Sequence, residues 1–205
     1  MSFLEWFVEH ESAMVQGKTT KEVCEMLKKR TQIKKCSYTD LLRAKGEHHH
    51  VGLAMFFVSH AWGGKFIELV AAVKKVVVKK GLSFQATYLW IDIFVVNQHL
   101  EISDFKYWTS NFEGSLVQIG HAIIVLSPWR KPMWVERAWC LFEYLTICHC
   151  RIEHDFSFPM EDEVDFIKCL EGGGGILEAV AAINMENAVA YNKRDEEGIK
   201  EFVKE

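Results

Sequence analysis

Three uninterrupted apolar stretches stand out in the chain after residue 50. They are LAMFFVS (53–59), TYLWIDIFVV (87–96) and HAIIVLS (121–127). Continuous apolar runs of this length, bounded by polar segments, are typical of strands buried on both faces of a parallel sheet. We therefore predict three core strands, and a weaker fourth strand over residues 152–158.

Helical spacing of apolar residues fills the segments between these runs. We predict a helix over 64–80 that is closed by Gly81, a short helix near 109–118 and a helix over 135–149. Further helices are expected at 161–171, 175–183 and 193–204. The alternation of strands and helices predicts βαβ units, and hence an α/β fold with a parallel sheet.

The first fifty residues have a different pattern, with signals for helix N-termini and no continuous apolar run typical of a strand. A hydroxyl residue precedes an acidic residue by three positions at Ser2–Glu5, Thr19–Glu22 and Ser37–Asp40. We predict three short helices ending near Gly46. We interpret residues 1–50 as a helical extension packed on the domain, and residues 51–205 as the α/β domain with its C-terminal helices. Covering the sheet is the role we expect for the added helices, because a parallel sheet is buried on both faces.

Composition narrows the class of protein. The 205 residues suit one compact chain, and 49% hydrophobic with 25% charged residues is an ordinary globular balance. The net charge of −4 gives no basic footprint, so we expect no nucleic-acid partner. Six irregularly spaced cysteines in mostly apolar runs indicate buried, reduced thiols. The acidic start of the chain has no signal-peptide pattern, and no apolar stretch approaches the ~20 residues of a membrane span. We therefore expect a cytoplasmic protein without a membrane partner.

Polar and aromatic residues follow each of the three predicted core strands. The strands run into Ser59, His60, Ala61, Trp62, Gly63 and Gly64, into Asp92, Ile93 and Phe94, and into Ser127, Pro128 and Trp129. In open parallel sheets ligands bind outside the carboxyl ends of the strands, so we predict the working site at this edge. Gly63 and Gly64 allow close backbone approach and precede a helix N-terminus, which favours an anionic group such as phosphate.

The helix that follows the third strand carries an acidic residue among apolar ones. Glu143 shares a helical face with Trp139, Cys140 and Ile147. If this face is buried, desolvation raises the pKa of the carboxyl group and marks a candidate functional site. The alternative is that Glu143 lies with Glu136 on a narrow solvent strip, and spacing alone leaves both orientations open.

Four sequence blocks occur in the order in which TIR domains present them. FFVSHAW corresponds to the first strand, WIDIF to the second strand and its loop, IIVLSPW to the third strand, and RAWCLFE to the helix with a WCxxE motif. Over residues 51–150 the chain resembles a divergent TIR-like group with SHAW and RAWCLxE signatures. The resemblance implies a flavodoxin-like, TIR-type parallel sheet flanked by helices, here with extra N- and C-terminal helices. The chain departs from many TIR domains at SHAW, where relatives carry an SF- or SY-type turn, and in the SPWRKPM segment.

The resemblance also implies a reaction. In TIR domains that consume NAD, the glutamate of WCxxE is catalytic, and Glu143 stands at that position. We expect an NAD glycohydrolase that releases nicotinamide and ADP-ribose or a cyclic product, with NAD as substrate and no cofactor. A carboxylate beside the ribose stabilises oxocarbenium character as the bond to nicotinamide breaks. The residues expected to bind substrate are Ser59, His60, Trp62, Gly63, Asp92, Phe94, Ser127, Trp129 and Trp139.

Structural roles remain open for several of these residues. His60 is either an acid or base near neutral pH or a ring that fixes its loop. Asp92 either contacts the ligand or caps the loop, and Trp139 either stacks on the ligand or fills the core. The tracts His48–His50 and Cys148–Cys150 lack a second pair of ligands downstream, so we expect no metal site.

A non-catalytic signalling module is the second function class that the resemblance implies. Many TIR domains associate through the loop after the second strand, here VVNQHLEISDFKYW, which mixes aromatic and acidic residues. The WCxxE glutamate favours the enzyme, because adaptor-type TIR domains commonly lack it. The family further implies self-association and a role in defence or cell-death signalling.

Overall fold

A parallel sheet organises the molecule. The computed structural model describes residues 2–100, 105–172, 188–190 and 193–202. Its strands are β1 (Phe56–His60), β2 (Leu89–Trp90), β3 (His121–Val125) and β4 (Glu153–Ser157). Within the described residues they form one four-stranded, all-parallel sheet in the order β2-β1-β3-β4. The predicted α/β class with a flavodoxin-like parallel sheet is thereby confirmed.

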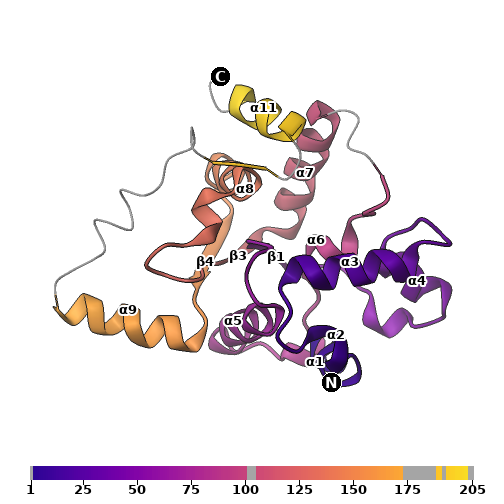
Figure 1. The fold of residues 1–205 in the computed structure, drawn as a ribbon, viewed down its shortest axis with the longest axis horizontal. Coiled ribbons are helices and arrows are strands. Elements are labelled where there is room, and N and C mark those ends of the chain that lie inside the picture. The colour runs from indigo at the N-terminus through magenta and orange to yellow at the C-terminus, as the bar shows by residue number, and fades with distance from the viewer. Residues whose placement is uncertain (1, 101–104, 173–187, 191–192, 203–205) are drawn as a thin grey trace.

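Helices cover both faces of this sheet (Figure 1). They are α1 (Phe3–His10), α2 (Ser12–Val15), α3 (Thr20–Thr31), α4 (Tyr38–Ala44), α5 (Phe66–Lys79), α6 (Asp92–Val95), α7 (Phe105–Ile119), α8 (Ala138–His149), α9 (Met160–Gly172) and α11 (Lys193–Phe202), with short 3-10 turns η1 (His48–His50), η2 (Phe84–Ala86) and η3 (Met133–Glu136). Helices α7, α8 and α11 pack on one face, and α5 packs on the other together with the N-terminal helices.

Strand β1 lies in the middle of both cores because its side chains alternate between the two faces. Phe56 and Val58 belong to the core formed with α5 and the N-terminal helices. Phe57 belongs to the core formed with α7 and α8. The alternation therefore places Ser59 on the α8 face and His60 on the α5 face, although the two residues are neighbours in the chain.

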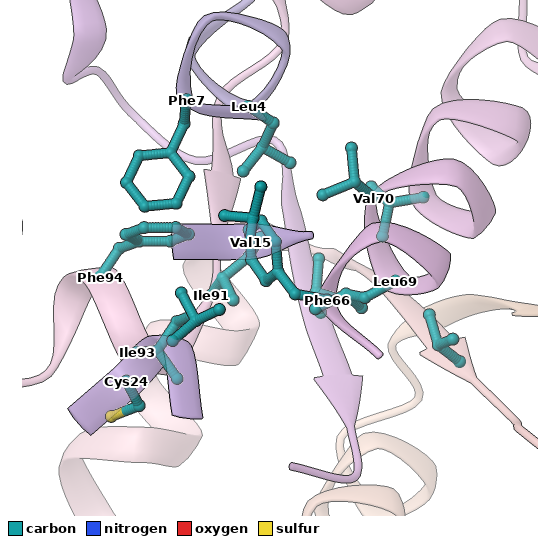
Figure 2. Packing of buried hydrophobic residues seen from close by; sticks show 14 of the residues in the cluster. Leu4, Phe7, Val15, Cys24, Phe66, Leu69, Val70, Ile91, Ile93 and Phe94 are labelled. Atoms are coloured by element: carbon teal, nitrogen blue, oxygen red, sulfur yellow. The ribbon is translucent and has the colours of Figure 1, made fainter. Parts of the chain in front are cut away.

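The N-terminal helices contribute large side chains to the core of the α5 face. Figure 2 shows Phe7 and Val15 packed among residues of α5 and α6 and Ile91, which follows β2. The Phe7 ring lies 5.8 Å from that of Phe66 and 5.2 Å from that of Phe94. The predicted capping boxes at Ser2 and Thr19 are both formed, which fixes where α1 and α3 begin. The first fifty residues thus complete this core.

The second predicted strand is much shorter than its apolar run. Only Leu89–Trp90 pair as β2, and the chain then turns into the four-residue helix α6. The Asp92 carboxylate accepts a hydrogen bond from the Ile93 backbone at 2.7 Å, which starts this turn, and Phe94 is buried by it. Periodicity alone does not separate a buried strand from a buried helical turn, so the sequence-based boundary was wrong here.

Most other predicted elements are close to those observed, but the segment before Gly46 forms four helices, α1 to α4, where three were predicted. Helix α7 begins earlier than expected, and η3 precedes α8 where one continuous helix was predicted. The helix predicted over 175–183 lies outside the described residues. Cys24 and Cys140 are buried free thiols as expected, whereas Cys148 is exposed. No described helix combines the length and the apolar character that a membrane span requires.

Left-handed backbone at two helix ends gives a stability test. Gly81 has φ +72° after α5, and Arg151 has φ +55° after α8. A side chain in this conformation costs about 1 kcal/mol, which glycine avoids. We expect Gly81→Ala to lower the free energy of unfolding by about 1 kcal/mol, and Arg151→Gly to raise it by up to about 1 kcal/mol. Urea denaturation measures both, and destabilisation by the glycine variant would contradict the conformation assigned to Arg151.

Candidate functional site

Two hydrogen bonds connect α8, β1 and η3 at the carboxyl edge of the sheet. Ser59 Oγ donates to Glu143 Oε2 at 2.5 Å, and Trp134 Nε1 donates to Ser59 Oγ at 2.8 Å. An indole N–H is only a donor, so the Ser59 hydroxyl accepts from Trp134 and keeps its own proton for Glu143. Ser59 and Trp134 are buried, which makes this a directed chain that ends on the carboxylate.

The segment before α8 explains why Trp134 reaches the strand. Arg137 is extended, with φ −104° and ψ 116°, and pairs with Val189 as an isolated parallel bridge. This extended residue separates η3 from α8, so Trp134 precedes the helix on a turn of its own. The Trp134 ring then packs edge-on against Tyr144 of α8 at 5.8 Å.

Burial dominates the electrostatics of Glu143. Desolvation raises the pKa of its carboxyl group from 4.5 to about 8, the Ser59 hydrogen bond lowers it, and the negative charge of Asp92 raises it. The side chain is half-buried and faces Ser59, whereas Glu136 is exposed in η3. Of the two orientations that spacing left open, the structure has the one that faces the sheet.

A second polar cluster lies on the opposite face of β1. Trp62 Nε1 donates to Asp92 Oδ2 at 2.7 Å, and His60 Nε2 lies 3.8 Å from Asp92 Oδ1. His60 Nε2 is buried and has no hydrogen-bond partner among the described residues. Burial lowers the pKa of His60, while Asp92 and a hydrogen bond with the Val58 backbone raise it. A neutral imidazole follows, held close to the Asp92 carboxylate without bonding to it.

Asp92 links the two clusters electrostatically. Its charge raises the pKa of Glu143 on one side and that of His60 on the other. The nearby Cys140 thiol donates to the His60 carbonyl at 3.5 Å. Burial, followed by the charge of Glu143, raises the pKa of this thiol well above its usual range, which argues against a thiolate nucleophile here.

Four predicted substrate-binding residues are engaged elsewhere. Phe94 packs against Phe3 and Phe7 in the N-terminal core. Ser127 and Trp129 donate to Asp162 and Asp165 of α9, at 2.9 and 2.6 Å. Trp139 Nε1 donates to Asp195 of α11 at 3.3 Å. The structure thus places Ser59 and Glu143 in one polar cluster, whereas Ser127, Trp129 and Trp139 hydrogen-bond to carboxylates of α9 and α11 and Phe94 packs in the core.

The glycine turn after β1 is bonded to α3. The carbonyls of Trp62 and Gly64 accept from the backbone N–H groups of Lys21 and Thr20, both at 2.9 Å. Gly63 is exposed, and a Cβ there would lie 3.0 Å from Met133 Sδ. A side chain at this position would therefore require Met133 to shift by a few tenths of an ångström.

The larger described cavity is separate from Glu143. It has a volume of about 630 Å³ and lies along the edge of β2, with Arg43, His50, Tyr88 and Trp90 in its wall. A second hollow of about 20 Å³ is bounded by His60 and Ser127. Glu143 lines neither of these two cavities, and its side chain is half-buried. Within the described ranges no three His, Cys, Asp or Glu side chains converge as a metal site would require.

Sequence reasoning missed Trp134 and the contacts of α3. Trp134 is one of several tryptophans in SPWRKPMWVERAW, and nothing in its spacing distinguishes it as the donor to Ser59. The contacts of Thr20 and Lys21 join α3 to a loop more than 40 residues away, which no local pattern indicates.

A carboxylate with a raised pKa destabilises the fold. Between pH 4.5 and about 8 the folded state binds more protons at Glu143 than the unfolded state, so the free energy of unfolding falls as pH rises through this window. We expect Glu143→Gln to be more stable than the parent at pH 9, on the order of 3 kcal/mol, with the difference vanishing near pH 4.5. Denaturant unfolding at both pH values measures this, with exposed Glu136→Gln as control. Lower stability of Glu143→Gln at pH 9 would show that the carboxylate is structural.

Comparison with protein-family models, curated proteins and solved structures gave no match to the chain.

Proposed function

We propose that the protein is an NAD glycohydrolase that cleaves the bond between nicotinamide and ribose. The observation that supports this most directly is the Glu143 carboxyl group, desolvated and bonded to Ser59 at the carboxyl edge of a parallel sheet. Perturbed carboxyl groups at this edge are typical of working sites. The proposal that this carboxyl group acts in NAD cleavage rests on the match of Glu143 to the glutamate of the WCxxE motif.

The reaction needs little proton transfer. The C1′–N bond breaks, its electron pair leaves with the pyridinium ring, and neutral nicotinamide departs without protonation. The ribose is left with oxocarbenium character, which water captures with loss of a proton to give ADP-ribose. Capture by a nitrogen of the adenine ring of the same molecule gives a cyclic product instead. The protein therefore has to supply an anion beside the ribose rather than an acid for the leaving group.

Glu143 fits this need once the substrate is present. With a pKa of about 8 the carboxyl group is mostly protonated at neutral pH in the free protein. The positively charged pyridinium of NAD favours the ionised form, because an opposite charge within a few ångströms lowers a carboxyl pKa. Ser59 donates to the carboxylate and so stabilises that form and fixes its direction. Substrate binding and activation of Glu143 are thus the same step.

Trp62 is the aromatic residue that we propose for stacking on the substrate, because Phe94 and Trp129 are buried. Its indole N–H is held by Asp92, and its side chain is only half-buried. A flat ring fixed in this way at the carboxyl edge suits stacking on nicotinamide or adenine. The exposed Gly63 follows directly and leaves room for the diphosphate.

A non-catalytic signalling module is the second candidate function. It is favoured by one observation, that Glu143 lines neither described cavity. Under the first proposal, self-association is the event that rearranges the loops around Glu143. Under the second, the same loops are an association surface only.

Nicotinamide release decides between these candidates. We expect purified protein, at high concentration or clustered on a scaffold, to release nicotinamide from NAD as measured by chromatography. Glu143→Gln should lower the rate about 10²- to 10³-fold, because it removes the anion and keeps the side-chain shape. Exposed Glu136→Gln serves as control and should match the parent. Equal nicotinamide release by the parent and Glu143→Gln would refute the role of Glu143. Absence of nicotinamide release by the clustered parent would favour the signalling module.

The pH dependence of the reaction tests the ionisation of Glu143. We expect kcat/KM to rise with pH through about 8, because this ratio reports the free enzyme, in which Glu143 must lose its proton. Asp92→Asn should move the midpoint to lower pH, since it removes the negative charge that raises this pKa. Initial rates from pH 5.5 to 9.5 give both profiles. An unchanged midpoint in Asp92→Asn would exclude Glu143 as the titrating group.

A further inference from the structure

Helix α3 contacts the two loops that flank the candidate site, one at each end. At its N-terminal end the backbone N–H groups of Thr20 and Lys21 donate to the carbonyls of Gly64 and Trp62, each at 2.9 Å. The Phe66 N–H donates in return to the Lys18 carbonyl at 2.9 Å. The loop after β1 is thus attached to α3 by several backbone bonds, which do not depend on side-chain identity.

The C-terminal end of α3 is attached to the loop after β2 by side chains. Thr31 Oγ lies 2.8 Å from His99 Nε2, and Asn97 Nδ2 donates to the Lys35 carbonyl at 2.8 Å. The Asn97 amide oxygen also accepts from the His99 backbone at 3.0 Å. Few bonds hold this end, and a single side-chain substitution removes one of them.

The Thr31 hydroxyl is bonded to its own helix as well as to His99. It is 3.2 Å from the carbonyls of both Leu27 and Lys28 and 2.8 Å from His99 Nε2. The tautomer of His99 decides whether Nε2 donates to the hydroxyl or accepts from it. The contact is a hydrogen bond in either case, and serine in place of Thr31 preserves it.

Helix α3 joins these contacts as one rigid body. Its twelve residues span about 17 Å at 1.5 Å per residue. Closer to the sheet, the bond from Trp62 to Asp92 links the bases of the same two loops. The distance between the two loops is thus set near the sheet by the Trp62–Asp92 bond, and farther from the sheet by the contacts of α3.

We propose that α3 is the positioning element of the candidate site, and that Thr31 is a positioning residue that acts through His99 on the loop over residues 96–100. The N-terminal end of α3 holds the loop after β1 in place, and Thr31 holds the loop after β2 at a set distance from it. The effect on catalysis rests on the proposed NAD cleavage, whereas the effect on the loop does not. The N-terminal helices then shape the site as well as covering the sheet.

Hydrogen exchange tests the effect on the loop without reference to activity. In full-length Thr31→Val we expect the amides of Val96, His99 and Leu100 to exchange about fivefold faster than in the parent, because one hydrogen bond of the loop is lost. The amides of Thr20 and Lys21 should keep their parental rates. Thr31→Ser should restore slow exchange. Thr87→Val is the matched control, since it removes another buried threonine hydroxyl, bonded to the Ser83 carbonyl.

Two exchange results would overturn the proposal. One is an unchanged rate over residues 96–100 in Thr31→Val. The other is equal acceleration throughout the N-terminal half, because this would show general destabilisation instead of local positioning.

Kinetics of nicotinamide release test the effect on the site. We expect Thr31→Val to raise KM for NAD about fivefold, with kcat within twofold of the parent, because Thr31 does not touch the reacting atoms. Thr31→Ser and Thr87→Val should match the parent. Local loosening with unchanged KM would refute the link between the loop and the site. If the clustered parent releases no nicotinamide, the proposed activity fails, and hydrogen exchange alone decides whether Thr31 positions the loop.

Discussion

The burial of β1 on both faces is the constraint that the candidate site depends on. Each polar residue at the end of this strand has to find a partner on its own side of the sheet, because neither face offers water. Ser59 meets this requirement with Trp134 and Glu143, which draws η3 and α8 to the strand. His60 meets it only in part, beside Asp92. The two polar clusters are consequences of this alternation along one strand.

The same burial lowers the stability of the folded protein at the site, because it desolvates the Glu143 carboxyl group. Glu143 gains one side-chain hydrogen bond from Ser59 and faces the added charge of Asp92, so desolvation outweighs its stabilisation. The aromatic core of this face offsets this, since the Phe112 ring packs edge-on against Phe57 at 5.3 Å and tilted against Phe142 at 5.7 Å. A well-packed core is what permits a desolvated carboxyl group to stay in place.

Much of the fold follows from local patterns, and much of the site does not. Long apolar runs and helix caps predicted the parallel sheet, the capping boxes at Ser2 and Thr19, and the end of α5 at Gly81. The partners of Phe94 and Trp129 depended on helices far away in sequence, so their position after a strand was not informative. The donor role of Trp134 likewise arises from a contact across 75 residues. Local sequence indicates which residues reach the edge of the sheet, and tertiary packing decides which of them meet.

The attachment of α3 also bears on the order of folding. Its contacts join Thr20 to Gly64 and Thr31 to His99, which are 44 and 68 residues apart in sequence. Contacts of such separation carry a large loop-closure entropy and slow the folding of a chain. On the ribosome α3 emerges well before His99, so it has to wait for both strands before it can dock fully. We therefore expect the candidate site to be among the last regions to reach native structure. A nascent chain would form its helices before its candidate site is assembled.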